Sequence, residues 1–442
     1  MKGKGMNISI LGGGLSGIAL AYFLQDDERI ERIDIWEKED GIGGLCRSIR
    51  KNGYTYDIGP HILFSKDKEM LNLMLSVLKE KNDLRRSNQI IYKGRNVQYP
   101  FENDLSKLPE DDRNYCVQSF ENNPYRNYVP DNMLQFFLKT FGEGITNTYL
   151  RPYNEKIWKY DPAFMDTQMV ERIPQPTDDE IRRSAAGETV DGYVHQLYFH
   201  FPREGGIEAV VKGFEKRLGE KCHIHLSALV EKVARTDVGF IITAEGVENR
   251  AGIVVSTMPI QELCAVYEGM NEDIADNVRD LKYNSIQIVF VHVEEDYSGD
   301  NFAFMIPEKD VIFHRISKMD FLGEAYHRRE GATYMVEITY RAGDYTDSLS
   351  EDEIKCRIED GMVYLGFAQN SSEISFINIT KHRYAYVIYD LHHRKNMNAI
   401  RSYFKAEGIH LSGRFGNFEY WNMDKVLREA GNLAARLKEK NL

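Results

Sequence analysis

The chain has 442 residues, of which 42% are hydrophobic, 28% charged and 12% aromatic. This composition is typical of an ordered globular protein and excludes a largely disordered chain. The 56 basic and 68 acidic residues give a formal net charge of −12 at pH 7. That balance argues against nucleic acid as a partner, because its phosphates would be repelled.

The sequence also argues against a membrane-spanning or secreted protein. No apolar run approaches the roughly 18–20 residues that cross a bilayer. The opening residues, MKGKGMNISI, lead directly into an apolar strand pattern, so we expect no signal peptide and a cytoplasmic location. No Cys-x-x-Cys pair occurs, and we expect neither a disulfide framework nor a metal site. The five cysteines are scattered, at Cys46, Cys116, Cys222, Cys264 and Cys356.

The N-terminal segment predicts a strand, a tight turn, a helix and a second strand. Residues 7–11 are apolar and β-branched, and residues 12–17 are rich in glycine. Residues 18–25 have helical spacing, and residues 33–36 form the next strand pattern. This order is typical of a Rossmann-like α/β fold.

Residues 67–204 differ in character, since helical patterns such as 69–79 and 132–140 alternate with loops rich in Asn, Asp and Pro. We expect a mostly helical insertion there. After a helix at 205–218, three short strands within 223–259 are expected to rejoin the first sheet. Residues 284–345 alternate apolar and polar positions over several runs, which predicts an antiparallel sheet.

The turn at residues 12–17 is the strongest chemical signal in the sequence. It fits G-x-G-x-x-G between a strand and a helix, where glycines allow backbone N–H groups to approach a pyrophosphate. Glu37 lies 20 residues beyond Gly17 (37 − 17), where an acid accepts hydrogen bonds from a ribose and disfavours a 2′-phosphate. The alternative is a turn that serves packing only. The dinucleotide-binding residues expected here are Gly12, Gly14, Leu15, Ser16, Gly17 and Glu37.

A second glycine cluster follows at residues 41–47, Gly-Ile-Gly-Gly-Leu-Cys-Arg. It resembles the post-strand motif of FAD enzymes of the amine oxidase and protoporphyrinogen oxidase type, which implies FAD as the cofactor. Arg47 either approaches the cofactor phosphates or is solvated. No second G-x-G-x-x-G indicates a separate NAD(P)H domain. This cluster adds Gly43, Gly44, Leu45 and Arg47 to the expected FAD-binding residues.

Later motifs resemble UDP-galactopyranose mutases more specifically. Residues 56–65, YDIGPHILFS, are similar to the mutase loop that crosses the flavin, with His61 against the isoalloxazine. Residues 151–158, RPYNEKIW, are similar to the segment that holds uridine, and place Tyr153 and Trp158 five residues apart. Arg172 stands where a mutase arginine holds the substrate diphosphate.

The resemblance continues to the C-terminus. Arg315 matches a second diphosphate arginine, and Tyr386 matches a tyrosine that reaches the same phosphates. Residues 413–424, GRFGNFEYWNMD, are similar to the mutase turn and helix start that meet the flavin. Guanidinium and phenol groups suit a diphosphate, because they offer charge-assisted and neutral donors. This segment implies contacts to FAD from Gly413, Arg414, Tyr420, Asn422 and Met423, and contacts to the substrate from Tyr420.

The resemblance therefore implies a nucleotide-sugar mutase that interconverts pyranose and furanose forms, as in cell-surface polysaccharide biosynthesis. Reduced flavin N5 would be the nucleophile on the anomeric carbon, with His61, Arg172 and Arg315 as catalytic residues. An external reductant is required, and NAD(P)H would have to use the substrate cleft.

The implied fold is α/β, with a Rossmann-like FAD-binding domain, a helical insertion and an antiparallel-sheet substrate domain. We expect a discontinuous FAD-binding domain at 1–66, 205–270 and 395–442. The insertion would span 67–204, and the substrate domain 271–394. The aromatic-rich stretch 126–160 fits either a homo-oligomer interface or the core of the insertion.

Two alternatives remain open from the sequence. Pro60 before the histidine is also seen in protoporphyrinogen-oxidase-like and desaturase-like flavoenzymes, which favours an FAD-dependent oxidoreductase. Val387 and Asn422 also depart from the mutase pattern, in which a proline and an aspartate are usual. The second alternative is a nucleotide-binding protein without catalytic activity.

Overall fold

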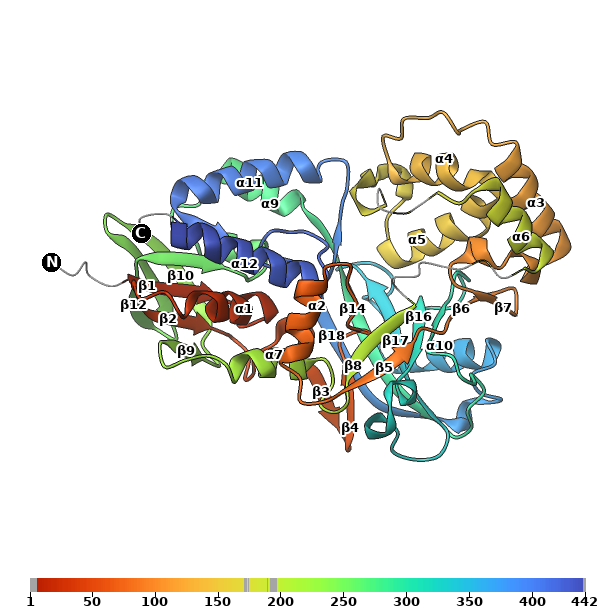
Figure 1. Ribbon diagram of the computed structural model, residues 1–442, viewed down its shortest axis with the longest axis horizontal. Coiled ribbons are helices and arrows are strands. Elements are labelled where there is room, and N and C mark those ends of the chain that lie inside the picture. The colour runs from red at the N-terminus through yellow and green to blue at the C-terminus, as the bar shows by residue number, and fades with distance from the viewer. Residues whose placement is uncertain (1–5, 171–172, 174, 189, 191–196, 440–442) are drawn as a thin grey trace.

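A computed structural model describes residues 6–170, 173, 175–188, 190 and 197–439. Figure 1 shows a parallel-sheet part that carries the N- and C-terminal elements, a helical part, and an antiparallel-sheet part below the helices. Among the described residues, no helix is both long and apolar enough to cross a bilayer.

The first part is built on a five-stranded parallel sheet with strand order β19-β13-β1-β2-β9. Its central strands β1 and β13 are largely buried because both faces of the sheet are covered. Ile8 and Ile10 of β1 pack on one face against helices, whereas Leu11 packs with the small sheet on the other. The strands are β1 (Met6–Leu11), β2 (Ile30–Trp36), β9 (Cys222–His225), β13 (Ile253–Ser256) and β19 (Ile409–Leu411).

Helices and a small antiparallel sheet complete this part. The helices that share the core of Ile8 and Ile10 are α1 (Leu15–Leu24), α2 (Lys68–Ser76), α7 (Glu208–Glu215) and α12 (Met423–Glu439). The opposite core includes α8 (Ile260–Val266), α9 (Glu272–Asp280) and α11 (His393–Glu407). The small sheet is β10 (Val230–Thr236), β11 (Gly239–Ala244) and β12 (Val247–Ala251). The predicted strands of 223–259 therefore divide, since β9 and β13 join the parallel sheet while β10–β12 form their own.

The helical part follows in the middle of the chain, where apolar residues at helical spacing bury one face of each helix. Its helices are α3 (Glu110–Glu121), α4 (Met133–Ile145), a π-helical turn (Thr146–Leu150), α5 (Arg151–Trp158) and α6 (Asp178–Ala186). The region expected to be mostly helical also contributes strands, because their apolar positions alternate. These strands are β5 (Lys81–Arg85), β6 (Asn88–Tyr92), β7 (Arg95–Gln98) and β8 (Tyr198–Pro202).

The antiparallel-sheet part has seven strands in the order β18-β14-β17-β16-β15-β6-β7, and only the β15–β6 pair is parallel. Helix α10 (Glu351–Tyr364) packs on one face of this sheet. A short hairpin, β3 (Ser48–Lys51) and β4 (Tyr54–Asp57), leads from the parallel-sheet part toward the seven-stranded sheet. The remaining strands are β14 (Lys282–Val293), β15 (Ala303–Met305), β16 (Arg315–Lys318), β17 (Ala332–Tyr340) and β18 (Ile374–Ile388).

Candidate active site

The glycine turn after β1 has the geometry that its motif predicts. Gly12 has φ +107°, a conformation that only glycine adopts readily. A Cβ on Gly17 would lie 2.1 Å from the carbonyl oxygen of Gly12, so this glycine allows α1 to pack closely on the turn. A Cβ on Gly14 would have no atom nearer than 3.9 Å, so the space beside it is open to a ligand. Glu37 is buried and accepts a hydrogen bond from the backbone N–H of Gly13 at 2.8 Å.

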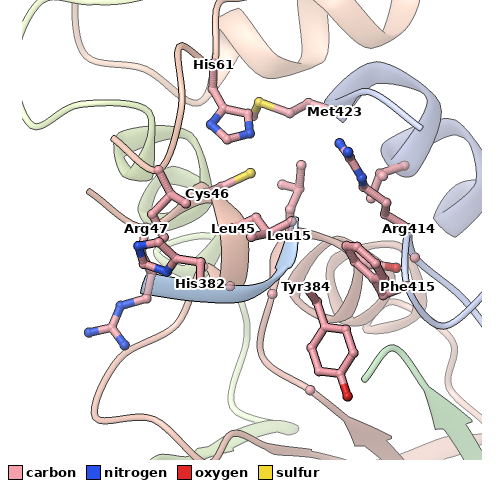
Figure 2. A pocket seen from close by; sticks show the side chains of 18 of the residues that line it. Leu15, Leu45, Cys46, Arg47, His61, His382, Tyr384, Arg414, Phe415 and Met423 are labelled. Carbon is pink, nitrogen blue, oxygen red and sulfur yellow. The ribbon is translucent and has the colours of Figure 1, made fainter. Parts of the chain in front are cut away.

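The second glycine cluster lies directly against the first. The backbone N–H of Gly43 donates to the carbonyl of Gly13 at 2.9 Å, and Gly43 and Gly44 both have positive φ. Arg47 pairs with Asp40 at 2.7 Å, and in Figure 2 its guanidinium points away from the centre of the cavity. The structure thus gives Arg47 an acidic partner on the protein.

A cavity of about 1490 Å³ runs from these turns into the rest of the molecule (Figure 2). It exceeds the roughly 300–1,000 Å³ of an ordinary small-molecule site, so it has room for a dinucleotide and a second ligand. Gly17 lies behind the turn rather than on the cavity wall. The expected site residues that line the cavity are Gly12, Gly14, Leu15, Ser16, Glu37, Gly43, Gly44, Leu45, Arg47, His61, Arg315, Gly413, Arg414, Asn422 and Met423.

The cradle fits a dinucleotide cofactor on the structure's own evidence. The open face of Gly14 lies at the N-terminus of α1, where unpaired N–H groups favour an anion. Gly413, with φ +80°, brings the C-terminal turn against Ser16, whose hydroxyl lies 3.0 Å from that of Ser412. The side-chain Nε of Arg414 is buried without a hydrogen bond to a described residue, as expected of a group that awaits a ligand.

His61 lines the cavity (Figure 2). Its Nδ1 is buried and makes no hydrogen bond with the described residues. Burial, together with the positive charges of Arg414 and Arg315, lowers the pKa of His61 to about 4. The imidazole is therefore neutral at pH 7 and can donate from one nitrogen and accept at the other.

Arg315, expected to hold a diphosphate, is bound to a carboxylate of the protein. It stands directly opposite Glu337 in the β16–β17 register. Its Nη2 donates to Glu337 Oε2 at 2.6 Å, and its Nε donates to Oε1. Burial would lower the pKa of Arg315, but the Glu337 carboxylate raises it well above its usual value. The guanidinium of Arg315 is thus always protonated. The Glu337 carboxylate compensates its charge along the edge that carries Nε and Nη2.

The expected aromatic substrate residues form a packed cluster beside the cavity. Tyr386 and Tyr420 stack at 6.0 Å, and Trp158 packs edge-on against both, at 5.7 Å and 5.6 Å. The guanidinium of Arg414 lies 4.1 Å from the centre of the Tyr420 ring. Through Arg414 this cluster contacts a side chain that lines the cavity, whereas Trp158 itself is buried.

Tyr153 stacks on Tyr149 at 5.3 Å, so one face of its ring is covered by a protein side chain. Burial is the main cause that raises the pKa of Tyr153. The positive charge of Arg315 lowers this pKa, and the negative charge of Glu337 raises it. The expected diphosphate residue Arg172 lies outside the described residues.

Several site residues were not predicted from the sequence. Arg86 lines the cavity beside Arg315 and lies 5.0 Å from the centre of the Phe64 ring. Cys46 also lines it, and burial raises the pKa of that thiol to about 12, so the thiol stays protonated. No local sequence motif points to Glu337, because only the β16–β17 register brings it to Arg315.

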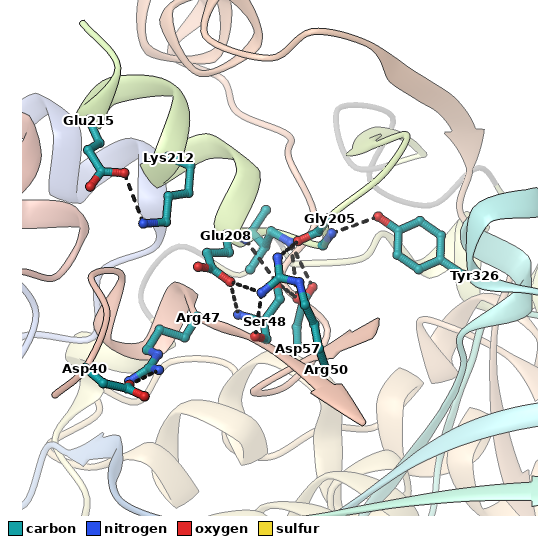
Figure 3. Close-up of polar contacts among 12 residues, drawn as sticks. Asp40, Arg47, Ser48, Arg50, Asp57, Gly205, Glu208, Lys212, Glu215 and Tyr326 are labelled. Atoms are coloured by element: carbon teal, nitrogen blue, oxygen red, sulfur yellow. Dashed lines mark hydrogen bonds and ion pairs between the residues drawn. The ribbon is translucent and has the colours of Figure 1, made fainter. Parts of the chain in front are cut away.

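A polar cluster around the buried Asp57 includes Ser48 and Arg50, which line the cavity (Figure 3). Asp57 accepts hydrogen bonds from the Ser48 hydroxyl at 2.5 Å and from the backbone N–H of Ile207 at 3.1 Å, at the start of α7. Glu208 accepts from Arg50 at 2.8 Å. Burial raises the pKa of Asp57 to about 7 despite these bonds. The cluster ties the β3–β4 hairpin to α7.

No group of three or more His, Cys, Asp or Glu side chains among the described residues could hold a metal ion.

Comparison with known proteins agrees with this geometry. The model of the family described as "Flavin containing amine oxidoreductase" matches residues 15–411, which is most of the chain. The chain belongs to this family. The predicted resemblance to this superfamily and the predicted α/β fold class are therefore confirmed, and the family supports a flavin cofactor.

Individual relatives show how far the likeness extends. A UDP-galactopyranose mutase of Mycoplasma genitalium is 27% identical over 179 residues, 38% of this chain and 43% of that protein. A 4,4′-diapophytoene desaturase of Staphylococcus aureus is 27% identical over 107 residues, 23% of this chain and 21% of that protein. The matches thus span less than half the length of these curated relatives.

Among solved structures, reduced UDP-galactopyranose mutase superposes with a TM-score of 0.90 at 23% identity, covering 98% of this chain and 94% of that chain. At that identity the likeness establishes the fold. The chain therefore shares the fold of the mutase along nearly its whole length.

Proposed function

We propose that this flavoenzyme is an FAD-dependent nucleotide-sugar mutase that interconverts pyranose and furanose forms. The observation that carries the proposal is the shared cavity, which runs from the dinucleotide turn past His61 to the guanidinium of Arg315. Such a cavity suits a flavin dinucleotide and a second anionic ligand side by side. The mutase relative and the mutase fold support the same reading.

FAD would be held by the two glycine turns and by the turn at Gly413, with Glu37 on a ribose. When bound in its reduced form, the flavin supplies the nucleophile N5 for the anomeric carbon. The isomerisation consumes no electrons, so a reductant such as NAD(P)H is needed only to keep the flavin reduced.

The chain's own residues would bind and orient the substrate. We assign the diphosphate to Arg172 and Arg315, because a guanidinium donates to phosphate oxygens in a fork. Tyr386 and Tyr420 would add phenolic donors. Because the imidazole of His61 is neutral at pH 7, it would contact the flavin without adding a positive charge beside it. Tyr153 and Trp158, which pack beside the cavity, are assigned to the nucleoside.

A second candidate is an FAD-dependent oxidoreductase of the amine oxidase or protoporphyrinogen oxidase type. One observation favours it: Glu337 neutralises Arg315, so the cavity is less cationic than a site built only for a diphosphate. Such an enzyme would pass electrons from its substrate through the flavin to an acceptor.

One experiment separates these candidates. The purified yellow protein is reduced with dithionite and incubated with UDP-galactose and other nucleotide sugars, and the products are resolved by chromatography. We expect a furanose product that forms only under reduction. Flavin reduction by an amine or carbon substrate, with acceptor-dependent turnover, would instead establish the oxidoreductase. Bound flavin without either activity would indicate a binding protein.

The diphosphate assignment has its own test. Arg172→Ala should retain FAD while turnover falls by at least about 100-fold, as expected when a charge-assisted contact is lost. Unchanged turnover in this variant would exclude that role.

A further inference from the structure

Two segments that line the main cavity come from opposite ends of the chain. Residues 60–64, in the loop that carries His61, line it from one side, and residues 421–424 line it where α12 begins. In Figure 2 the side chains of His61 and Met423 point toward one another. Helix α2, which follows the loop, shares a hydrophobic core with α12 and lies beside it in Figure 1. Contacts between the loop and α12 therefore bear on the shape of the cavity.

Ser65 makes the first of two side-chain links between them. Its hydroxyl accepts a hydrogen bond from the backbone N–H of Asp67 at 2.9 Å and donates to the carboxylate of Asp424, in the first turn of α12. A carboxylate only accepts hydrogen bonds, so the hydroxyl proton points at Asp424. Because the acceptor is charged, this bond is stronger than one between neutral groups.

Asp67 makes the second link. It accepts hydrogen bonds from Nε and Nη2 of Arg428 at 2.8 Å and 2.9 Å, and it also caps α2 by accepting from the backbone N–H of Met70 at 3.2 Å. The bonds from Arg428 are the main cause that lowers the pKa of Asp67. Both side chains are 33% exposed, so this link is weaker than a buried pair, although its forked geometry gives it direction.

The middle of the loop is anchored separately. The backbones of Leu63 and His200, on β8, exchange two hydrogen bonds at 2.9 Å and 2.8 Å. His61 lies two residues before this anchor, and Ser65 lies two residues after it. The two links to α12 thus fix the part of the loop that runs from Leu63 to the start of α2.

We propose that Ser65 with Asp424, and Asp67 with Arg428, are positioning residues for the cofactor. These four residues are called the loop–helix clamp below. The clamp holds the His61 loop against the start of α12, so that a bound flavin meets the loop and the helix start in one arrangement. This inference rests on the proposed FAD site, and it applies equally to a mutase and to an oxidoreductase.

The test measures the FAD dissociation constant and the visible circular dichroism of the bound flavin. Ser65→Ala should weaken FAD binding about 10-fold, the loss expected for one hydrogen bond to a charged group, and should change the dichroism. Ser65→Thr keeps the hydroxyl and should restore both. Arg428→Gln, at the more exposed link, should weaken FAD binding about 3-fold and covers the case in which Ser65→Ala fails to fold. Ser348→Ala, an exposed serine outside the cavity lining that also donates one hydrogen bond, is the matched control.

A double-variant cycle shows whether the clamp acts through the loop residue that faces the cavity. In a His61→Ala background, Ser65→Ala should weaken FAD binding by less than about 2-fold, because the side chain that it positions is already gone. The full loss in both backgrounds would mean that Ser65 does not act through His61, and would overturn the proposal.

The remaining outcomes are distinct. A loss in Ser65→Ala that Ser65→Thr restores, with wild-type affinity in Ser348→Ala, supports the clamp. If Ser65→Ala and Arg428→Gln lower only the urea midpoint and leave FAD affinity and dichroism unchanged, the clamp supports the fold alone and the proposal is overturned, while the proposed function stands. If the wild-type protein binds no FAD, the proposed function fails, and this inference fails with it.

Discussion

The pair of Arg315 and Glu337 makes a strong prediction about stability. Glu337 is completely buried, whereas the side chain of Arg315 is 26% exposed. Removing one partner of a buried pair costs about 3–5 kcal/mol, because the other charge stays behind without compensation. The cost should be unequal here, since water reaches the arginine but not the glutamate.

We therefore expect Glu337→Leu to lower the free energy of unfolding by about 3 kcal/mol, and Arg315→Met by about 4–5 kcal/mol. The double variant should cost less than either single variant, because it buries no unpaired charge. Unfolding in urea, followed by circular dichroism, measures all three. The exposed pair Arg203–Glu80 provides the control cycle, with a coupling of at most about 1 kcal/mol.

Additive losses in the double variant would refute this reasoning. They would mean that Arg315 and Glu337 contribute independently, and that their bidentate geometry does not couple them. A larger loss for Glu337→Leu than for Arg315→Met would refute the argument from unequal exposure.

Three further predictions concern the cofactor turn and the buried carboxyl behind it. Gly17→Ala should prevent stable folding, because its Cβ would lie 2.1 Å from the Gly12 carbonyl, whereas Gly14→Ala should fold and lose flavin absorbance after gel filtration. Glu37→Ala should release flavin more readily on dilution, because both the ribose acceptor and the bond to the turn are lost, and flavin that stays bound as in wild type would contradict this. Burial raises the pKa of Asp57 from 3.8 to about 7, so its contribution to stability is fully present below pH 4 and is lost as pH rises through 7. That loss is about 1 kcal/mol per pH unit in the window, and Asp57→Asn should flatten the pH dependence of the urea midpoint. An unchanged slope in that variant would assign the effect elsewhere.

Most of the residues expected to bind the cofactor line one cavity, and their sequence signals are local. The spacing of Gly12, Gly14 and Gly17, and the distance to Glu37, are fixed by one strand, one turn and one helix. The turn at Gly413 was predicted only by resemblance, yet it meets Ser16 across nearly 400 residues of chain. Because the motif at residues 413–424 is long, its resemblance to the mutase motif was enough to predict where this turn lies in the fold.

The substrate half was less predictable because strand pairing sets it. Strands β6 and β7 join the seven-stranded sheet through a parallel pairing with β15, although the surrounding sequence is helical. Arg86 reaches the cavity wall from the short connection between β5 and β6. The closed aromatic cluster of Trp158, Tyr386 and Tyr420 likewise depends on three distant segments meeting, which spacing alone cannot show.

The β16–β17 register places Arg315 opposite Glu337 and so determines which N–H groups of the guanidinium can bind a ligand. A guanidinium has five N–H donors, and the two bonds to Glu337 use two of them; the other three make no hydrogen bond with the described residues and can bind a ligand. The pair is close to neutral as a unit, so a ligand gains directional hydrogen bonds more than net charge from it. Such a site favours a group that matches the remaining donors in geometry, as one edge of a diphosphate does. Glu337 would then act as a positioning residue that keeps the guanidinium plane in a single orientation beside His61.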